Sequence, residues 1–309
     1  MTLTTSAGIQ TNVPYYEGCI PSIPWGCWDV KNEFEIKSGQ RVLVDSNLFD
    51  TTFSEGQAGF FIWNCGIVND PNIMCNDITI QNNLFMHGPS VGTPFGYGGF
   101  GPQNTNTSRG SIRNNLAIDI SGPTWGANGY VGSVQNTKFQ TIDHNTWINT
   151  PTFNTNPFSV MFAGAPPHTN TGFVWTNNFM YGQPFADSEN AGMTMADWAN
   201  NGVPVTVAGM VNVGDYFGYG SGLPVYPPGM TSLSSSTNSC QTSGKNYTTC
   251  WPLDWALVGM LDFTGCNAGT NLAGCALSSG SPYKDAGTDG MDIGANVAAV
   301  VAALAPIVW

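Results

Sequence analysis

The sequence is poor in charged residues, which make up only 9% of its 309 residues. It has 8 Lys and Arg against 20 Asp and Glu, so its formal net charge is -12. A chain with so few cations lacks the basic patch that displaces counterions from nucleic acid, so we expect no nucleic-acid partner. Helical proteins usually solvate their outer faces with Lys and Glu, and this chain has too few of both. Its 38 Gly and 20 Pro indicate strands and turns instead.

Signals for several common activities are also missing. The chain has no G-x-S-x-G, no phosphate-binding loop and no H-E-x-x-H. Its first twelve residues contain no apolar segment of the kind that signal peptides have. The longest apolar run, Val297–Trp309, is too short to cross a bilayer and is broken by Pro306, so we expect no membrane span.

The eight cysteines form no C-x-x-C pair and lie far from the three histidines in sequence, which argues against a zinc site. They fall into four sequential couples whose members are 8, 10, 10 and 9 residues apart: Cys19 and Cys27, Cys65 and Cys75, Cys240 and Cys250, Cys266 and Cys275. The simplest interpretation is four local disulfides, although the sequence does not fix the connectivity. An even number of cysteines favours an oxidising, extracellular compartment.

A short motif of the form apolar–x–apolar–x–x–Asn–x–apolar recurs along the chain. Its asparagines are 36, 32, 30 and 33 residues apart, at Asn47, Asn83, Asn115, Asn145 and Asn178. Each copy predicts a strand, a sharp turn and another strand, and Asn tolerates the left-handed conformation that a tight turn requires. A degraded sixth copy lies at 203–213. A period of about 30 residues, too rich in Gly and Pro for helix pairs, predicts a β-solenoid with Asn amides bonded from coil to coil.

The repeat resembles the right-handed parallel β-helix of the pectate-lyase-like superfamily, with its asparagine ladder. Two segments, Trp28–Val44 and Ser281–Ala295, are similar to bacterial β-helix proteins of mostly unassigned activity. The resemblance implies an all-β fold, a right-handed parallel β-helix of about six coils, with an ending that closes the last coil. We therefore divide the chain into an N-terminal disulfide loop or cap (1–27), the β-helix (28–215), a Cys-containing loop-rich extension (216–280) and a closing motif with an apolar tail (281–309).

Alignment of the copies on the ladder asparagine assigns residues to rows along the solenoid. Three positions before the asparagine the residue is apolar and should point inward: Val44, Ile80, Ile112, Ile142 and Trp175. Two positions before it the residue is polar and should point outward: Asp45, Gln81, Arg113, Asp143 and Thr176. In a preceding set of strands, alternation sends Phe34 inward and sends Glu35 and Lys37 outward. Phe61 and Trp63 are expected on that same outer face.

The outward positions supply the candidate catalytic residues, which are Glu35, Lys37, Arg41, Asp45, Arg113, Asp143 and His144. An eliminative reaction would use Lys37 or Arg113 as its base. A hydrolytic reaction needs two carboxylates at a defined separation, for which Glu35 and Asp143 are the candidates. Asp45 and Asp143 are three coils apart, about 14 Å from the strand spacing, which is too far.

Two of these candidates also have simpler interpretations. Asp143 and His144 form either an acid/base pair or a turn in which His144 fills a place that Asn has in other copies. Arg113 and Asp143 are expected to be vertical neighbours, which makes a surface ion pair of small value the alternative to a catalytic role. His87 and His168 are isolated in predicted loops and receive no role.

Aromatic side chains are candidates for contact with sugar rings. Trp63 is the expected stacking platform beside Glu35 and Lys37, with Phe61 on the same face. Tyr97 belongs to a Gly-aromatic loop, 95–100, that can either contact substrate or form a packed turn.

No cofactor is required by these motifs, and Ca²⁺ is the one cation to consider. Asp285, Asp289 and Asp292 in the closing motif carry the hard oxygen ligands that Ca²⁺ prefers. The alternative is a set of Asp-Gly turns that need no metal.

We therefore expect an extracellular polysaccharide-acting protein, either a lyase or a glycoside hydrolase, with a groove along the solenoid face. Two alternatives stay open. One is a non-catalytic structural or adhesive β-solenoid that forms homo-oligomers or filaments by stacking its coil ends. The other is a protein that binds carbohydrate without turnover. Fold alone implies none of these, so the placement of the polar residues has to decide.

Overall fold

The structure is a computed structural model of the chain. It describes residues 33–52, 59–63, 73–88, 92–93, 107–120, 132–134, 138–149, 158–162, 172–181, 183–187, 205–213, 239–243, 247–251 and 255–306. The predictions for Cys19, Cys27, Cys65, Tyr97 and His168 lie outside the described residues, as does the side chain of Trp63.

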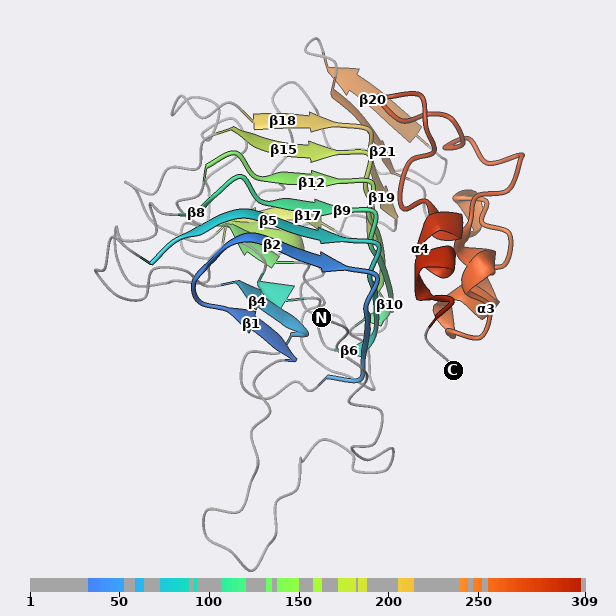
Figure 1. The fold of residues 1–309 in the computed structure, drawn as a ribbon. Coiled ribbons are helices and arrows are strands. Elements are labelled where there is room, and N and C mark those ends of the chain that lie inside the picture. Colours follow the sequence, from blue (N-terminus) through green and yellow to red (C-terminus); the bar gives the residue numbers. More distant parts are fainter. Residues whose placement is uncertain are drawn as a thin grey trace, which may run out of the picture.

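The chain winds through three faces in turn, and strands of successive coils stack in parallel register (Figure 1). The first face contains β1 (Phe34–Ile36), β4 (Phe61–Trp63) and β7 (Gly92–Thr93), followed by β11 (Gly132–Val134), β14 (Phe158–Phe162) and β17 (Gln183–Asp187). A seven-stranded sheet contains β2 (Gly39–Asp45), β5 (Cys75–Gln81), β8 (Thr107–Ser108), β9 (Ser111–Arg113), β12 (Thr141–Asp143), β15 (Phe173–Thr176) and β18 (Val205–Ala208). An eight-stranded sheet contains β3 (Leu48–Asp50), β6 (Leu84–Gly88), β10 (Leu116–Ile120), β13 (Thr146–Asn149), β16 (Phe179–Tyr181), β19 (Met210–Val213), β21 (Tyr247–Trp251) and β20 (Ser239–Ser243).

Each coil contributes one stretch of strand to each face, so the described residues trace six coils, from β1–β2–β3 to β17–β18–β19. β7 lies beside β11, which brings the two halves of the first face together. The predicted all-β fold is therefore confirmed as a parallel β-helix. The degraded sixth motif copy is confirmed as β18 and β19, whose residues pair in parallel with β15 and β16.

A buried asparagine ladder connects the coils at the corner between the seven-stranded and eight-stranded sheets. Asn115 illustrates the pattern: its Oδ1 accepts from the backbone N–H and the Nδ2 of Asn83, at 3.0 and 2.9 Å. Its own N and Nδ2 donate to Asn145 Oδ1 in the next coil. The ladder ends with Asn178 in the fifth coil, because the buried Met210 takes the asparagine position in the sixth coil.

The left-handed backbone that makes this corner lies one residue before the ladder asparagine, not at the asparagine as the sequence suggested. The five residues at this position all have φ between 50° and 59°: Ser46, Asn82, Asn114, His144 and Asn177. A sharp bend at this position turns the chain and leaves the following asparagine side chain aimed into the core, where the ladder needs it.

The core lies between the three faces and is filled by the predicted inward row. Val44, Ile80, Ile112, Ile142 and Trp175 are all buried. Aromatic rings also stack from coil to coil, as in Phe49 on Phe85, whose centroids are 4.8 Å apart. These contacts bury apolar area at every coil and set the register.

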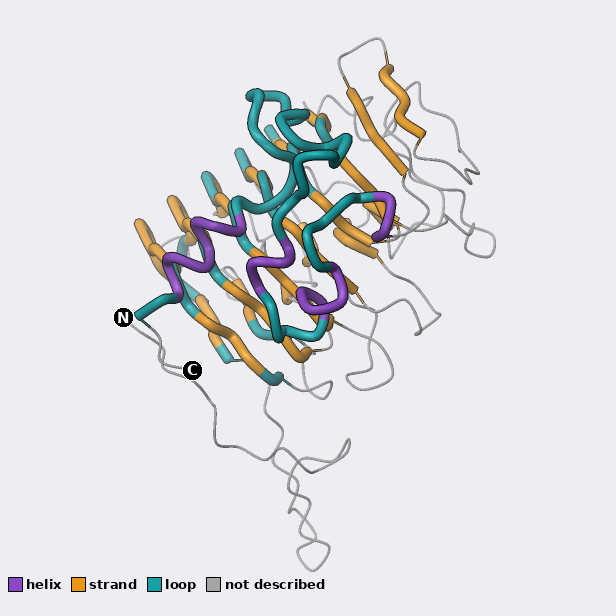
Figure 2. Tube along the Cα trace, turned by 90° about the vertical axis from the view of Figure 1, so that its right-hand side faces the viewer, coloured by secondary structure: helices purple, strands orange, loops and turns teal. Residues whose placement is uncertain are grey.

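The C-terminal segment covers the outer face of the eight-stranded sheet (Figure 2). It contains η1 (Trp255–Leu257), α3 (Phe263–Asn267), η2 (Leu272–Cys275) and α4 (Val297–Leu304). Val297, Val300 and Leu304 of α4 belong to the apolar cluster on this face. The same cluster includes the outward-facing Leu84 and Leu116 of the sheet, so this face is filled by the chain itself.

The segment that resembles a coil-closing motif runs along the side of the solenoid instead. Its backbone N–H groups donate to three successive coils at the sheet corner: Thr288 N to Asn177 Oδ1, Ala295 N to Thr146 Oγ1 and Asn296 N to Asn114 Oδ1. The segment therefore ties the fifth, fourth and third coils together and does not lie across the end of the last coil.

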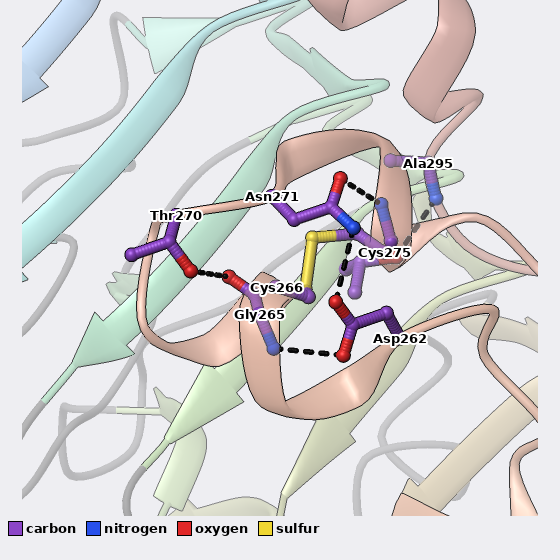
Figure 3. Close-up of a disulfide and its surroundings, with 9 residues drawn as sticks. Asp262, Gly265, Cys266, Thr270, Asn271, Cys275 and Ala295 are labelled. Atoms are coloured by element: carbon purple, nitrogen blue, oxygen red, sulfur yellow. Dashed lines mark hydrogen bonds between the residues drawn. A yellow bond between two sulfur atoms is a disulfide. The ribbon is translucent and has the colours of Figure 1, made fainter.

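One predicted disulfide, Cys266–Cys275, is confirmed and fastens α3 to η2 (Figure 3). The turn around it is held by Asp262, which accepts from Gly265 N and from Asn271 Nδ2, both at 3.0 Å. Cys75 is also disulfide-bonded, with its partner outside the described residues. The antiparallel pairing of β20 and β21 places Cys240 opposite Cys250, the couple that the spacing predicted.

Candidate functional site

The predicted outward polar row is in register along the seven-stranded sheet. Asp45, Gln81, Arg113 and Asp143 follow one another at successive coils. Their hydrogen bonds run along the row: Gln81 Nε2 donates to Asp45 Oδ2 and Arg113 Nε donates to Gln81 Oε1, both at 2.9 Å. The row is therefore a polar surface in which hydrogen bonds link the side chains of successive coils. Within it, the amide of Gln81 donates to the carboxylate of Asp45.

The carboxylate of Asp45 is saturated by these neighbours. Burial raises its pKa, but the hydrogen bonds from Gln81, Asn82 and Ser46 outweigh burial and lower the pKa below its ordinary value. Asp45 is therefore held as a carboxylate by its hydrogen bonds to neighbouring coils.

Arg113 and Asp143 are vertical neighbours, as predicted, but their side chains engage different partners. Arg113 reaches back to Gln81. Asp143 accepts from Thr176 Oγ1 at 2.6 Å and contacts His144 Nδ1 at 3.0 Å. Burial raises the pKa of Asp143, but its hydrogen bonds to His144 and Thr176 outweigh burial and lower it.

His144 contacts Asp143, as the sequence suggested, but its other ring nitrogen faces the C-terminal segment. Nε2 lies 3.5 Å from Asp289 Oδ2, and the residue is only 7% exposed. Burial lowers its pKa, but the hydrogen bond and charge of Asp143 and the charge of Asp289 outweigh burial and raise it. His144 therefore joins two segments by ion-pair contacts, and its buried Nε2 makes no hydrogen bond to any residue that the structure describes.

On the first face, Glu35 and Lys37 form an ion pair that the sequence analysis did not predict, with Lys37 Nζ 3.4 Å from Glu35 Oε1. The outward placement of Phe61 is wrong, because its ring is 2% exposed and stacks on Phe34. The equivalence of the two strands is shifted by one residue: Phe61 pairs with Phe34, and the backbone of Trp63 pairs with Ile36. A one-residue shift moves a side chain to the opposite face, so the aromatic side chain predicted to face the sugar fills the core.

Arg41 belongs to a second column of left-handed residues, which crosses the outer surface of the seven-stranded sheet. The column continues with Asp77 and Arg109, and both Nε and Nη2 of Arg109 donate to the carboxylate of Asp77. Arg41 lowers the pKa of Asp77 through its charge, although the hydrogen bond from Arg109 is the larger cause.

A cluster that the sequence analysis missed lies where the eight-stranded sheet ends and the first face begins. We call it the corner cluster, and it consists of Glu33, Asp50, His87 and Asp119. His87 Nδ1 lies 2.6 Å from Asp50 Oδ1, and His87 Nε2 lies 4.0 Å from Asp119 Oδ2. Asp50, His87 and Asp119 come from three successive coils, and about 30% of each side chain is exposed.

Glu33 is the most perturbed acid of the corner cluster. It lies directly before β1, and burial together with the negative charge of Asp50 raises its pKa to about 8. Its Oε1 is buried with no hydrogen-bond partner among the described residues. The hydrogen bond from His87 to Asp50 raises the pKa of His87 and outweighs its burial. The corner cluster therefore offers a carboxyl, that of Glu33, which is protonated near neutral pH, and beside it the Asp50 side chain that contacts His87.

The sequence did contain a signal for part of the corner cluster. Thr51, His87 and Asp119 each stand four residues after a ladder asparagine, and each has a left-handed backbone, with φ of 66°, 61° and 50°. This position lies outside the rows that precede the ladder asparagine, so the pattern before the asparagine gives no role to His87. Glu33 has no such signal, because its burial depends on the packing of β1 against the next coil.

Among the residues that the structure describes, no three His, Cys, Asp or Glu side chains are arranged to hold a metal ion. The three acids proposed for Ca²⁺ are used separately. Asp292 accepts from Lys284 Nζ and Asp285 N, and Asp289 accepts from Met291 N and faces His144. Within the described ranges, no helix is long and apolar enough to cross a membrane.

The chain matches no protein-family model, and neither the curated proteins nor the solved structures contain a significant match.

Proposed function

We propose that this protein hydrolyses polysaccharides at the corner cluster, as a secreted member of the right-handed, pectate-lyase-like β-helices. The single observation that carries the proposal is the contrast between Glu33 and Asp50. One carboxyl is held protonated to about pH 8, and a neighbouring carboxyl is held by a hydrogen bond to His87. Glycoside hydrolysis needs a protonated carboxyl as general acid and a second carboxyl beside it.

Each residue has a role that follows from its surroundings. Glu33 is the general acid that protonates the leaving oxygen, because burial keeps its proton at neutral pH. Asp50 is the base or nucleophile. His87 orients Asp50 through the 2.6 Å contact, and Asp119 supports the far side of the imidazole. The partial exposure of Asp50, His87 and Asp119 gives a substrate access to them.

Elimination and structural assembly receive less support. The proposed base Lys37 is paired with Glu35, and Arg113 is hydrogen-bonded to Gln81, so each proposed base already has a partner within the protein. At one end of the eight-stranded sheet a second chain would meet the antiparallel β20 in place of a coil, while β2, β3 and β18 are the other terminal strands of the seven-stranded and eight-stranded sheets. The disulfides support an oxidising compartment and hence secretion.

The test is a panel of neutral and acidic polysaccharides, assayed for new reducing ends and for the ultraviolet absorbance of unsaturated uronates. We expect reducing ends without that absorbance. Glu33→Gln should lower the rate by about a hundredfold or more, since general acid catalysis typically contributes this much. Glu35→Gln is the matched control, two residues further along the chain in β1, and should keep activity. Activity lost in Glu35→Gln and kept in Glu33→Gln would move the acid to Glu35, and unsaturated products would replace hydrolysis by elimination.

A further inference from the structure

The corner cluster lies at the edge of the area that the C-terminal segment covers. Asp50, Met86 and Ile118 occupy one outward row of the eight-stranded sheet, in register from the first coil to the third. Met86 and Ile118 are 5% and 0% exposed, whereas 29% of the Asp50 side chain is exposed. In this row the cover therefore stops between Met86 and Asp50, and His87 follows Met86 directly in the chain.

The disulfide-bonded turn of the C-terminal segment forms the edge of this cover (Figure 3). A Cβ placed on Gly269 would lie 2.7 Å from Met86 Cε and 3.8 Å from Ile118 Cδ1, so the backbone of the turn rests on these two side chains. The residues on either side of Gly269, Ala268 and Thr270, are exposed. A molecule that reaches the corner cluster across this face is therefore expected to contact them.

This side of the protein is acidic. Among the described residues, the strands of the eight-stranded sheet contain no Lys or Arg. Lys284 is the only one in the described C-terminal segment, and its Nζ lies 3.0 Å from Asp292 Oδ2. At the corner cluster, Asp50 and Asp119 stand on the two sides of His87. A uronate carboxylate would be repelled by these two acids, so the charges favour a neutral sugar.

We propose that the corner cluster takes a neutral polysaccharide, and that the sugar unit beside the cleaved bond lies against Ala268 and Thr270. The substrate assigned in this way rests on the proposed function. Thr270 is a specificity-determining residue, because its methyl group packs on the sugar and its hydroxyl accepts from a sugar hydroxyl while donating to Gly265 O. The turn has no charged group that would hold a carboxylate.

The test compares kcat/KM of the full chain on galactan, xylan and mixed-linkage β-glucan, which are neutral, with kcat/KM on polygalacturonate. The unaltered chain should cleave at least one neutral polymer with a kcat/KM about tenfold or more above that on polygalacturonate. Thr270→Lys adds the cation that this side lacks, so it should raise kcat/KM on polygalacturonate about tenfold and lower it on the neutral polymer.

Two variants control this change of specificity. Thr270→Gln adds length without charge and should gain nothing on polygalacturonate. Ala286→Lys adds the same charge at an exposed residue of the C-terminal segment, two residues before Thr288, which bonds to Asn177 of the fifth coil. It should behave like the unaltered chain on every polymer.

A second measurement tests whether Thr270 lies beside the corner cluster and does not depend on turnover. In Thr270→Lys the pKa of His87, followed by NMR of the imidazole, should fall, because a nearby cation disfavours the protonated ring. Ala286→Lys should leave the titration unchanged. An unchanged titration in Thr270→Lys would overturn the placement of the sugar.

The outcomes also separate the substrate from the proposed function. Preferred hydrolysis of polygalacturonate, lost in Glu33→Gln, would overturn the neutral substrate and leave the proposed function standing. No hydrolysis of any polymer by the unaltered chain would overturn the proposed function, and the substrate assigned here with it.

Discussion

His144 Nε2 faces Asp289 Oδ2 at 3.5 Å, and this contact joins the fourth coil to the C-terminal segment. On its other side the imidazole contacts Asp143 at 3.0 Å. The equivalent positions of neighbouring coils hold Asn114 and Asn177, which bond the same segment through Asn296 N and Thr288 N. One corner of the solenoid therefore fastens the segment at three levels, and the fourth coil uses a titratable residue to do so.

The first prediction concerns the pH dependence of this contact. The pKa of His144 is raised, so its stabilising contribution is fully present below the unfolded value of about 6.5 and is lost as pH rises through the folded value. The pKa of Asp143 is lowered, so its contribution is lost as pH falls through its folded value. Asp289→Asn should cost about 1 kcal/mol near pH 5.5 and much less near pH 9, measured by urea unfolding.

Two variants control this prediction. Asp285→Asn removes the same charge from the same segment. Because Asn tolerates the left-handed backbone of residue 285, this variant should leave the free energy of unfolding nearly unchanged. His144→Asn introduces the residue that neighbouring coils use and should flatten the pH dependence. An equal loss for Asp289→Asn at both pH values would exclude the ionic contact as the cause.

The second prediction concerns the asparagine ladder. Asn115→Ala leaves buried donors of Asn83 without an acceptor and removes a donor to Ile80 O, so it should cost about 3 kcal/mol. Asn47→Ala removes donors to Asn83 and Asp45 at the first rung and should cost about 1 kcal/mol. Chemical denaturation compares the free energies of unfolding of the two variants. Similar losses at both positions would contradict the expectation that a middle asparagine of the ladder contributes more than the first.

The third prediction concerns Glu33, whose folded pKa of about 8 stands above the ordinary 4.5. The folded chain keeps this proton while the unfolded chain releases it, so stability falls as pH rises between these values. Glu33→Gln removes that penalty. It should match the unaltered chain near pH 4 and be more stable by about 2 kcal/mol near pH 8.5. If the free energies of unfolding of Glu33→Gln and of the unaltered chain changed in parallel over this pH range, the result would refute a buried, protonated Glu33.

The fourth prediction concerns Cys266–Cys275, which closes a loop with a sequence separation of 9. Replacing both cysteines with serine should cost about 2–3 kcal/mol through the entropy of the unfolded loop. The loss should appear first in α3 and η2, as faster hydrogen exchange there than in the ladder strands. Uniform exchange along the chain, or an unchanged midpoint of unfolding, would show that the packing around Asp262 suffices without the disulfide.

The sequence by itself determined the solenoid and its rows. The spacing of the five asparagines and the alternation of apolar residues were enough to predict the coils, the buried Ile112 and Ile142, and the outward Asp45 and Arg113. These features are readable because each coil packs against a copy of the same local pattern, so the repeat in sequence is also the repeat in space. The couple Cys266 and Cys275 was readable for a similar reason, since the bond closes a short loop.

Only the tertiary structure decided where the chemistry lies. The corner cluster unites Glu33 and Asp50 of the first coil with His87 and Asp119 of the next two, and the burial of Glu33 comes from packing across coils. The shift of Phe61 by one residue, into the core, depends on how β4 pairs with β1. The contact of His144 with Asp289 depends on the path of the C-terminal segment along the eight-stranded sheet. In each case the contacting residues are not related by the sequence repeat. Burial and charge depend on which residues are neighbours in space, so the sequence pattern alone could not show these contacts.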